Sequence, residues 1–155
     1  MKNDHVVKKQ AFNLLFAGFF LFLLGLITGL IVPAFAAPRL AVSSHIEGVL
    51  NGMFLILLGL VWHKLALSDK VLKITYWLAL YGTFANWFGL LFSAITNAGK
   101  MLGVMAGGKE GSPVAEAVVA FFLITLSIAM VIISVMVLVG LKKGFATGNQ
   151  DSSNN

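Results

Sequence analysis

Four apolar segments, each long enough to cross a lipid bilayer, constrain the fold of this 155-residue chain more than any other feature of its sequence. A membrane-spanning helix needs about 20 mostly apolar residues, because each residue advances the helix by about 1.5 Å. The segments are residues 12–32, 38–62, 72–97 and 114–141. They predict an all-α integral membrane protein, a bundle of four transmembrane helices embedded in the lipid bilayer.

Short connections join the segments, so residues 1–145 are predicted to form a single four-helix membrane domain. Ser112 and Pro113 suit the N-cap and first positions of the last helix. Residues 146–155 are rich in Gly, Ser and Asn, a composition typical of disorder, and we expect them to form a disordered tail.

The first apolar segment has an alternative interpretation as a cleaved signal peptide. Lys8 and Lys9 precede it, and the small-residue sequence Ala34-Phe35-Ala36, of the kind found at cleavage sites, follows it. The segment spans 21 residues, 12–32. Because signal peptides have apolar regions of about 7–15 residues, we expect this segment to be retained as a helix.

Basic residues flank the apolar segments unevenly. Eight lie at the amino end, in the second connection and at the carboxyl end: Lys2, Lys8, Lys9, Lys64, Lys70, Lys73, Lys142 and Lys143. Three lie in the other two connections: Arg39, Lys100 and Lys109. Because cytoplasmic loops carry the excess of Lys and Arg, both termini are predicted to be cytoplasmic, in a multi-pass protein of the bacterial inner membrane. The same distribution accounts for the net charge of +5 without a nucleic-acid partner, since no basic patch with interleaved aromatic residues is present.

Small residues recur at helical spacing in three of the segments. They are Gly25 and Gly29, then Gly48, Gly52 and Gly59, then Ala85, Gly89 and Ser93. Such ridges let helix backbones approach closely inside a membrane, where hydrophobic burial does not drive association. They predict tight packing and permit self-association of the chain.

Polar residues inside the segments are the candidates for function. The chain has no cysteine, which excludes thiolate metal sites, cysteine nucleophiles and covalent haem attachment through cysteine. His45, Glu47 and Asn51 lie within seven residues at the front of the second segment. An Asp, Lys or Arg in the hydrocarbon costs at least about 2.5–3.5 kcal/mol on insertion scales, so a buried glutamate is also expected to need a partner.

The start of the second helix decides whether these three residues are buried. If the helix begins at Ser44, then Ser44 and Glu47 form a capping box and His45 lies at the membrane surface. If Pro38 is the first residue, His45 lies about 10 Å along the helix axis and the polar groups need partners. The residues by themselves leave both starts open.

The two faces of this stretch differ in character. Glu47 and Asn51 are four residues apart and share a face, whereas His45 points nearer to Gly48 and Gly52. The two glycines would leave room for a large group beside the imidazole. A histidine in a membrane helix is either a hydrogen-bonded structural residue or a ligand for a metal or cofactor, and this pattern is compatible with both.

Two further polar stripes lie on the third and fourth segments. The third carries Asn86, Ser93 and Asn97, and the fourth carries Glu116, Ser127 and Ser134. Interhelical hydrogen bonds, at about 0.6 kcal/mol per contact, explain most stripes of this kind. Two carboxylates, a histidine and several carboxamides in one small bundle nevertheless predict a polar pocket.

Two stretches resemble the hydroxylaminobenzene mutase family of small four-helix membrane proteins and, more distantly, the styrene oxide isomerases. They are PRLAVSSHIEGVLNGMFLILLGLVW and LALYGTFANWFGLLFSA. The elements shared with the isomerases are His45, Asn51-Gly52-Met53 and Ala85-Asn86. The likeness covers about residues 12–141 and favours Pro38 as the start of the second helix.

The resemblance implies an isomerase that rearranges an N-aryl hydroxylamine to an ortho-aminophenol with no net redox change. By analogy with the styrene oxide isomerases, it also implies a ferric haem b that acts as a Lewis acid. The assembly implied is a homotrimer with the haem at or near the subunit interfaces, acting on a small aromatic substrate.

Site residues follow from the same resemblance. His45 would be the axial ligand of the haem iron, with Gly48 and Gly52 beside the cofactor. Asn51 and Asn86 would orient the substrate. Glu47 would orient the imidazole of His45 without binding the iron itself. The other role considered for Glu47 is proton transfer.

The chain departs from the epoxide isomerases at two positions. Where those enzymes have an aspartate four residues before Asn86 and a tyrosine four residues after it, this chain has Gly82 and Leu90. The phrase YGTFANW, residues 81–87, resembles the mutases instead. One alternative is an aryl epoxide isomerase. Another is a non-enzymatic haem-binding or electron-transfer subunit, many of which ligate haem with two histidines; the second one near the membrane here is His63, five turns from His45 on the same predicted helix. A small transporter is a third alternative, although no inverted repeat is evident.

Overall fold

A computed structural model describes residues 4–153 of the chain, with side chains described to residue 146. Its four long helices are α1 (Asp4–Leu30), α2 (Pro38–Val61), α3 (Asp69–Thr96) and α5 (Pro113–Ser153). Short helical turns lie between them: η1 (Val32–Ala34), η2 (Trp62–Lys64), η3 (Lys100–Leu102) and α4 (Gly103–Ala106). The four long helices are long and apolar enough to cross a membrane, and the described residues contain no strand, which confirms the predicted all-helical fold.

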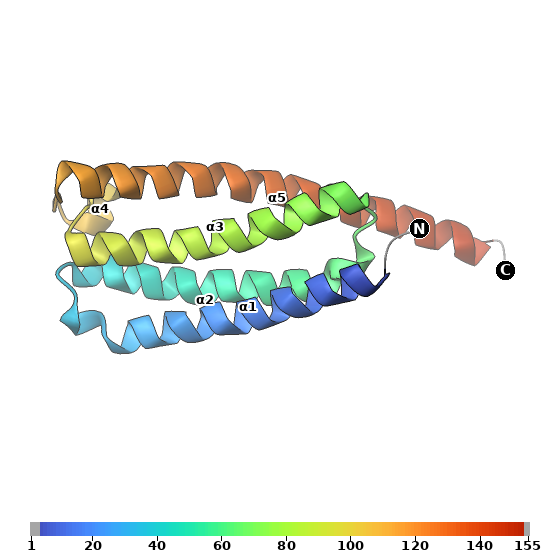
Figure 1. Ribbon diagram of the computed structural model, residues 1–155, viewed down its shortest axis with the longest axis horizontal. Helices are drawn as coiled ribbons and strands as arrows, with labels where there is room; N and C mark the ends of the chain where they lie inside the picture. The colour runs from blue at the N-terminus through green and yellow to red at the C-terminus, as the bar shows by residue number, and fades with distance from the viewer. Residues whose placement is uncertain (1–3, 154–155) are drawn as a thin grey trace.

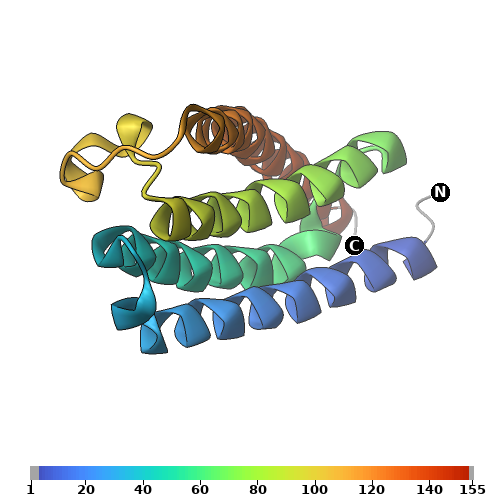
Figure 2. The same cartoon turned by 60° about the vertical axis from the view of Figure 1, so that its left-hand side comes forward.

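The four long helices run antiparallel and pack in the order α1, α2, α3, α5 (Figure 1). Helix α2 packs between α1 and α3, and α5 packs along α3; no comparable contact joins α5 to α1 or α2 among the described residues. The same order is visible after rotation, with α1 and α5 on opposite sides of the molecule (Figure 2). The outer faces of α1 and α5 are apolar and exposed, as expected of surfaces that meet lipid.

The basic residues separate between the two ends of the bundle. Helix α1 begins and α5 leaves the bundle at the same end, where the α2–α3 connection also lies (Figure 1). Seven of the basic residues counted above lie in these segments: Lys8, Lys9, Lys64, Lys70, Lys73, Lys142 and Lys143. Lys100 and Lys109 lie in the α3–α5 connection and Arg39 lies in the first turn of α2, all at the opposite end.

Helix α2 begins at Pro38, as the resemblance favoured. Ala37 is its N-cap residue and donates its backbone N–H to the carbonyl of Ala94 at 3.0 Å. Ser44 lies fully buried in the second turn, and its hydroxyl donates to the backbone carbonyl of Trp87 at 3.0 Å. The capping-box interpretation at Ser44 is therefore wrong, because that hydroxyl joins α2 to α3.

Two helix boundaries differ from the sequence prediction by more than three residues. Helix α1 begins at Asp4, eight residues before the apolar segment, so its first turns carry Lys8 and Lys9. Helix α5 continues to Ser153, through residues 146–153, where a disordered tail was expected. Backbone hydrogen bonds along the helix need no tertiary partner, so α5 can extend past the bundle where composition alone predicted disorder (Figure 1). Residues 154 and 155 lie outside the described part.

Glycines bring α1 and α2 into backbone contact. A Cβ atom added at Gly48 would lie 2.7 Å from the Cα of Gly25, and one added at Gly52 would lie 2.7 Å from the backbone nitrogen of Phe22. No side chain fits in either place without displacement of α1. The predicted glycine ridges are thus used within the chain, between α1 and α2, where close approach increases van der Waals contact.

The connection from α3 to α5 is held by Glu116. Its Oε1 accepts the backbone N–H groups of Gly99 at 3.0 Å and Gly111 at 2.8 Å, and its Oε2 accepts that of Lys100 at 3.1 Å. Ser112 caps α5 by accepting the N–H of Ala115 at 3.3 Å, which confirms the predicted N-cap.

Two residues of the polar stripe on α3, Ser93 and Asn97, also lie at this connection. Asn97 ends α3 in the left-handed region, with φ 59°, and the hydroxyl of Ser93 donates to the carbonyl of Ala98. The expectation that Glu116 shares one polar pocket with the other polar groups is corrected, because its carboxylate, like the hydroxyl of Ser93, binds backbone atoms at the end of the bundle. Oδ1 of Asn97 is buried there and accepts no hydrogen bond from the described residues.

Substitution Gly48→Ala tests the α1–α2 contact. The added methyl group must displace the backbone of α1, so we expect the free energy of unfolding to fall by about 1–3 kcal/mol. Unfolding in detergent, followed by circular dichroism, measures the change. Leu138→Ala, at a residue of α5 that is 68% exposed, is the control and should change it by less than about 0.5 kcal/mol. Equal stability of the two variants would contradict the contact.

Substitution Glu116→Ala removes the acceptor of three backbone N–H groups. We expect a loss of about 1–3 kcal/mol of stability, because donors that a side chain satisfied are left without it. Proteolysis should also cut the chain faster between residues 97 and 112. Glu110→Ala removes an exposed carboxylate from the same connection and should have neither effect.

Candidate active site

Three polar side chains from two helices meet inside the bundle. The side-chain N–H groups of Asn51 and Asn86 both donate to Oε2 of Glu47, at 3.0 and 2.8 Å. Asn51 also donates to the backbone carbonyl of Glu47 at 2.8 Å, which fixes its amide along α2. Asn51 is 5% exposed, whereas Glu47 and Asn86 are partly buried. We call these three residues the carboxamide–carboxylate cluster.

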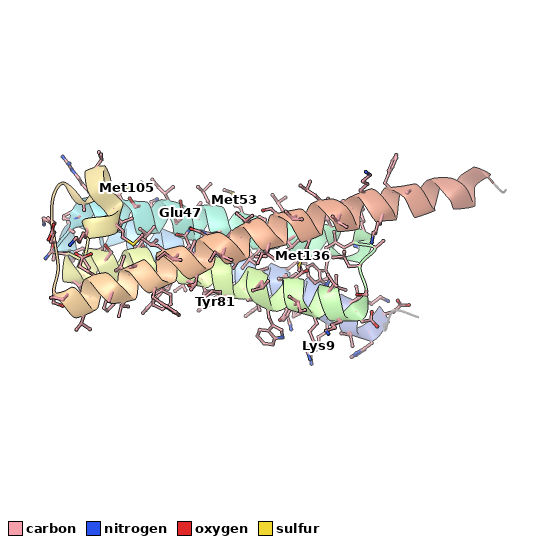
Figure 3. All side chains as sticks on the ribbon, turned by 90° about the horizontal axis from the view of Figure 1, so that it is seen from above. Lys9, Glu47, Met53, Tyr81, Met105 and Met136 are labelled. Atoms are coloured by element: carbon pink, nitrogen blue, oxygen red, sulfur yellow. The ribbon has the colours of Figure 1, made fainter. Side chains whose placement is uncertain are left out.

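The cluster has open hydrogen-bonding capacity. Among the described residues, Oε1 of Glu47 and the two amide oxygens Oδ1 of Asn51 and Asn86 accept no hydrogen bond, and none of them is a fully buried atom. Figure 3 labels Glu47 on α2, nearer than Met53 to the end that carries α4. The cluster therefore offers three oxygen acceptors to a small molecule within the apolar part of the helices.

A second set of hydrogen bonds fixes the helices around the cluster. The indole N–H of Trp87 donates to the hydroxyl of Thr28 at 3.2 Å, and that hydroxyl donates to the carbonyl of Leu24 at 2.8 Å. With the bond from Ser44 to the carbonyl of Trp87, these contacts tie α1, α2 and α3 together at one level. They hold Asn86, the neighbour of Trp87, at the level of Glu47.

His45 lies against α1. Its Nδ1 is 2.8 Å from the backbone carbonyl oxygen of Gly25. A carbonyl oxygen only accepts, so Nδ1 carries the proton and Nε2 of the neutral ring keeps its lone pair. A Cβ atom added at Gly29 would lie 2.6 Å from Nδ1, so the lack of a side chain there makes the space for the ring. A metal-binding histidine is commonly oriented in this way, by donation from its other nitrogen to a carbonyl.

His45 and the carboxamide–carboxylate cluster lie on different sides of α2. Residues 45 and 47 are about 200° apart around a helix. The contacts agree, since His45 bonds α1 and Glu47 bonds Asn86 of α3. A single chain therefore does not bring the imidazole and the carboxylate together, and the predicted contact in which Glu47 orients His45 is corrected: the carbonyl of Gly25 has that position.

Gly48 and Gly52 also have a different role from the one expected. The space beside them is filled by the backbone of α1, at Gly25 and Phe22. The interpretation that these glycines make room for a cofactor beside His45 is therefore corrected. The partly exposed edge of the imidazole is the part that a large group could approach.

Gly25, Gly29 and Thr28 are parts of the site that were not predicted from the sequence. The first two were noted only as packing residues, although a histidine opposite two glycines could have shown that a ring rests on them. Thr28 gave no distinct signal, because threonine is ordinary in membrane helices. The bond from Trp87 to Thr28 places this indole within the packed helices.

Metal binding by side chains alone has no candidate in the described part of the chain. Within it, no three His, Asp or Glu residues gather in the way that a metal ion would require. A haem needs only one axial ligand from the protein, since the porphyrin supplies four nitrogens. The neutral Nε2 of His45 meets that requirement.

Comparison with known proteins identifies relatives along nearly the whole chain. A family profile described as "Styrene oxide isomerase" matches residues 10–142. Hydroxylaminobenzene mutase HabB of Ectopseudomonas oleovorans is 45% identical over 141 residues, which cover 90% of this chain and 86% of that protein. Hydroxylaminobenzene mutase HabA of the same organism is 44% identical over 126 residues, which cover 81% and 93%. No solved structure matches the chain.

The profile spans most of the chain and includes both His45 and the cluster around Glu47. The two mutases align over most of their own length, so the likeness concerns whole proteins and not a shared segment. The chain therefore belongs to the styrene oxide isomerase family and is an isomerase related to the hydroxylaminobenzene mutases.

Proposed function

We propose that this protein is a membrane-embedded isomerase that rearranges an N-aryl hydroxylamine to an ortho-aminophenol. The observation that carries the proposal is the convergence of Asn51 and Asn86 on one oxygen of Glu47, within helices suited to a membrane. This arrangement leaves oxygen acceptors for the N–H and O–H groups of a hydroxylamine in surroundings that suit its aromatic ring. The names of the two mutases point to the same class of substrate.

The proposed cofactor is a ferric haem b, which Nε2 of His45 would hold. Donation from Nδ1 to the carbonyl of Gly25 fixes the ring and leaves Nε2 unprotonated, as ligation requires. When bound, the ferric haem would supply a Lewis acid that polarises the hydroxylamine oxygen and weakens the N–O bond.

The chain's own residues position the substrate. Asn51 and Asn86 donate amide N–H groups to Glu47, and their Oδ1 atoms, which accept no hydrogen bond from the described residues, remain as acceptors. We assign to them the N–H and O–H groups of the substrate. The apolar surroundings exclude bulk water, which would otherwise compete for the electrophilic ring carbon and give other products.

The proposed assembly is a homotrimer with the haem at or near the subunit interfaces. His45 and Glu47 lie on the two margins of an apolar stripe of α2 that neither α1 nor α3 covers. Its large members are Val42, Ile46, Leu50, Met53, Leu57 and Leu60, each at least 40% exposed. A second copy packed on this stripe would bring His45 of one subunit towards the cluster of another, which a single chain does not do.

In the membrane, we propose that the lysine-rich end of the bundle faces the cytoplasm and that the membrane is the bacterial inner membrane. Seven lysines gather at the end where α1 begins and α5 leaves. The positive-inside rule then places both termini in the cytoplasm.

Two other functions have less support. Epoxide isomerisation of the styrene oxide type would use an aspartate and a tyrosine at the positions of Gly82 and Leu90. A Cβ added at Gly82 would lie 2.9 Å from Sδ of Met130, and Leu90 is only 5% exposed, so neither position offers an acid or a phenol to a substrate. Electron transfer through a bis-histidine haem is disfavoured within one chain. His63 is exposed at the other end of α2, about 27 Å along the axis from His45.

The activity and the cofactor are tested together with purified protein. We expect conversion of phenylhydroxylamine to 2-aminophenol without added reductant, and a Soret absorption band that is lost in His45→Ala. His63→Ala is the control and should keep both. A folded, colourless wild-type protein that still forms 2-aminophenol would rule out the haem mechanism, and a coloured protein without conversion would rule out the activity.

The orientation is tested with single cysteines, since the chain has none of its own. Ser68→Cys lies between α2 and α3 at the lysine-rich end, and Glu110→Cys lies at the opposite end. In intact cells, a membrane-impermeant maleimide should label the cysteine at 110 and label the one at 68 only after lysis. The reverse labelling pattern would place the termini outside.

A further inference from the structure

The proposed rearrangement must move one proton in addition to the hydroxyl oxygen. In an N-aryl hydroxylamine the nitrogen carries one hydrogen and the ortho carbon carries one. In the ortho-aminophenol the nitrogen carries two hydrogens and the substituted carbon none. The reaction therefore breaks an ortho C–H bond and forms an N–H bond, whatever route the oxygen takes.

A proton carrier for this step should be an ionisable group with one open atom inside the apolar part of the protein. The chain has six carboxylate side chains: Asp4, Glu47, Asp69, Glu110, Glu116 and Asp151. Five of them lie at helix ends or in the α3–α5 connection, where both oxygens of Glu116 already accept backbone N–H groups. Glu47 lies ten residues into α2, well away from either end.

The two carboxylate oxygens of Glu47 differ in their hydrogen bonds. Oε2 accepts both carboxamide N–H groups, so two of its lone-pair directions are occupied. Oε1 accepts nothing from the described residues. A proton that reaches this carboxylate is therefore received by Oε1, while Oε2 keeps the side chain in place against Asn51 and Asn86.

Other titratable groups nearby are less suited. Nδ1 of His45 is already engaged with the carbonyl of Gly25, and the ring lies on another side of α2. The hydroxyl of Tyr81 pairs with that of Thr125 at 2.6 Å, between α3 and α5. Neither group forms a hydrogen bond with the two asparagines.

We propose that Oε1 of Glu47 carries the proton from the ortho carbon to the nitrogen. This inference rests on the proposed function and assigns the cluster a chemical step in addition to binding. After the N–O bond has broken and the C–O bond has formed, the ring is a hydroxycyclohexadiene imine whose ortho carbon still holds its hydrogen.

The step is balanced within the substrate and one carboxylate. Oε1 takes the ortho proton, and the C–H electron pair becomes the ring double bond that restores aromaticity. The electron pair of the C=N π bond then takes the proton from Oε1 to complete the amino group. Glu47 returns to its starting state, and no oxidant, reductant or water is consumed.

Substitution E47Q tests the assignment. The glutamine oxygen can still accept from Asn51 and Asn86, so the fold and the Soret band should be unchanged, but the side chain no longer takes up a proton. We expect turnover of phenylhydroxylamine to fall on the order of 10²–10⁴-fold. Substrate deuterated at both ortho positions should then react more slowly than unlabelled substrate in E47Q, because C–H cleavage becomes limiting, and at nearly the same rate in wild type.

Two further variants keep the test decisive. E47D retains a carboxylate and should retain much more activity than E47Q, with a smaller isotope effect. Glu110→Gln removes a surface carboxylate and should behave as wild type.

The outcomes separate this inference from the function on which it rests. A wild-type protein that does not convert aryl hydroxylamines removes both. An active wild type in which E47Q is equally fast, or in which E47Q and E47D are equally slow without any isotope effect, overturns the role of Glu47 alone. The second result would make Glu47 a positioning residue for the two asparagines.

Discussion

The structure depends on the direct contact between the backbones of α1 and α2. At Gly25 and Gly48 no side chain separates the two helices, so the carbonyl of Gly25 comes within hydrogen-bonding distance of His45. In a membrane, where lipid tails are as apolar as leucine, van der Waals contact of this closeness is a main source of helix association. The α1–α2 pair then forms a base against which α3 places Asn86 and Trp87. The packing of α1 on α2 and the orientation of His45, the candidate haem ligand, therefore both depend on this one contact.

The helices could be predicted from sequence because apolar length and flanking charge are local properties. Their number and their order along the chain were predicted correctly, whereas the start at Pro38 was favoured only by the resemblance to a known family, since the residues themselves left two starts open. The end of α5 was not predicted correctly, because composition does not report whether a polar segment continues a helix that has already been nucleated. The side-by-side order α1, α2, α3, α5 could not be predicted either. A ridge of small residues indicates that a helix packs against it but does not identify that helix.

For the site, helical spacing correctly placed Glu47 and Asn51 on one face and His45 on another. Partners could not be read from spacing, because the atoms that matter belong to other helices and two of them are backbone atoms. Gly48 and Gly52 illustrate this limit: an absent side chain was taken as room for a ligand, but α1 fills the room. Glu116 illustrates it again, as its carboxylate accepts N–H groups of a connection that has no periodicity to analyse.

The hydrogen-bond partner of His45 has a consequence for how the site can vary. A main-chain carbonyl is present at every residue type, so the acceptor itself is insensitive to mutation of α1. The position of that carbonyl, however, depends on the register of α1 against α2. A slip or tilt of one helix along the other would move the acceptor away from the imidazole without changing a single atom of the site. Because helix tilt responds to the local thickness of the bilayer, a change in that thickness that tilts α1 against α2 would also change the orientation of the histidine.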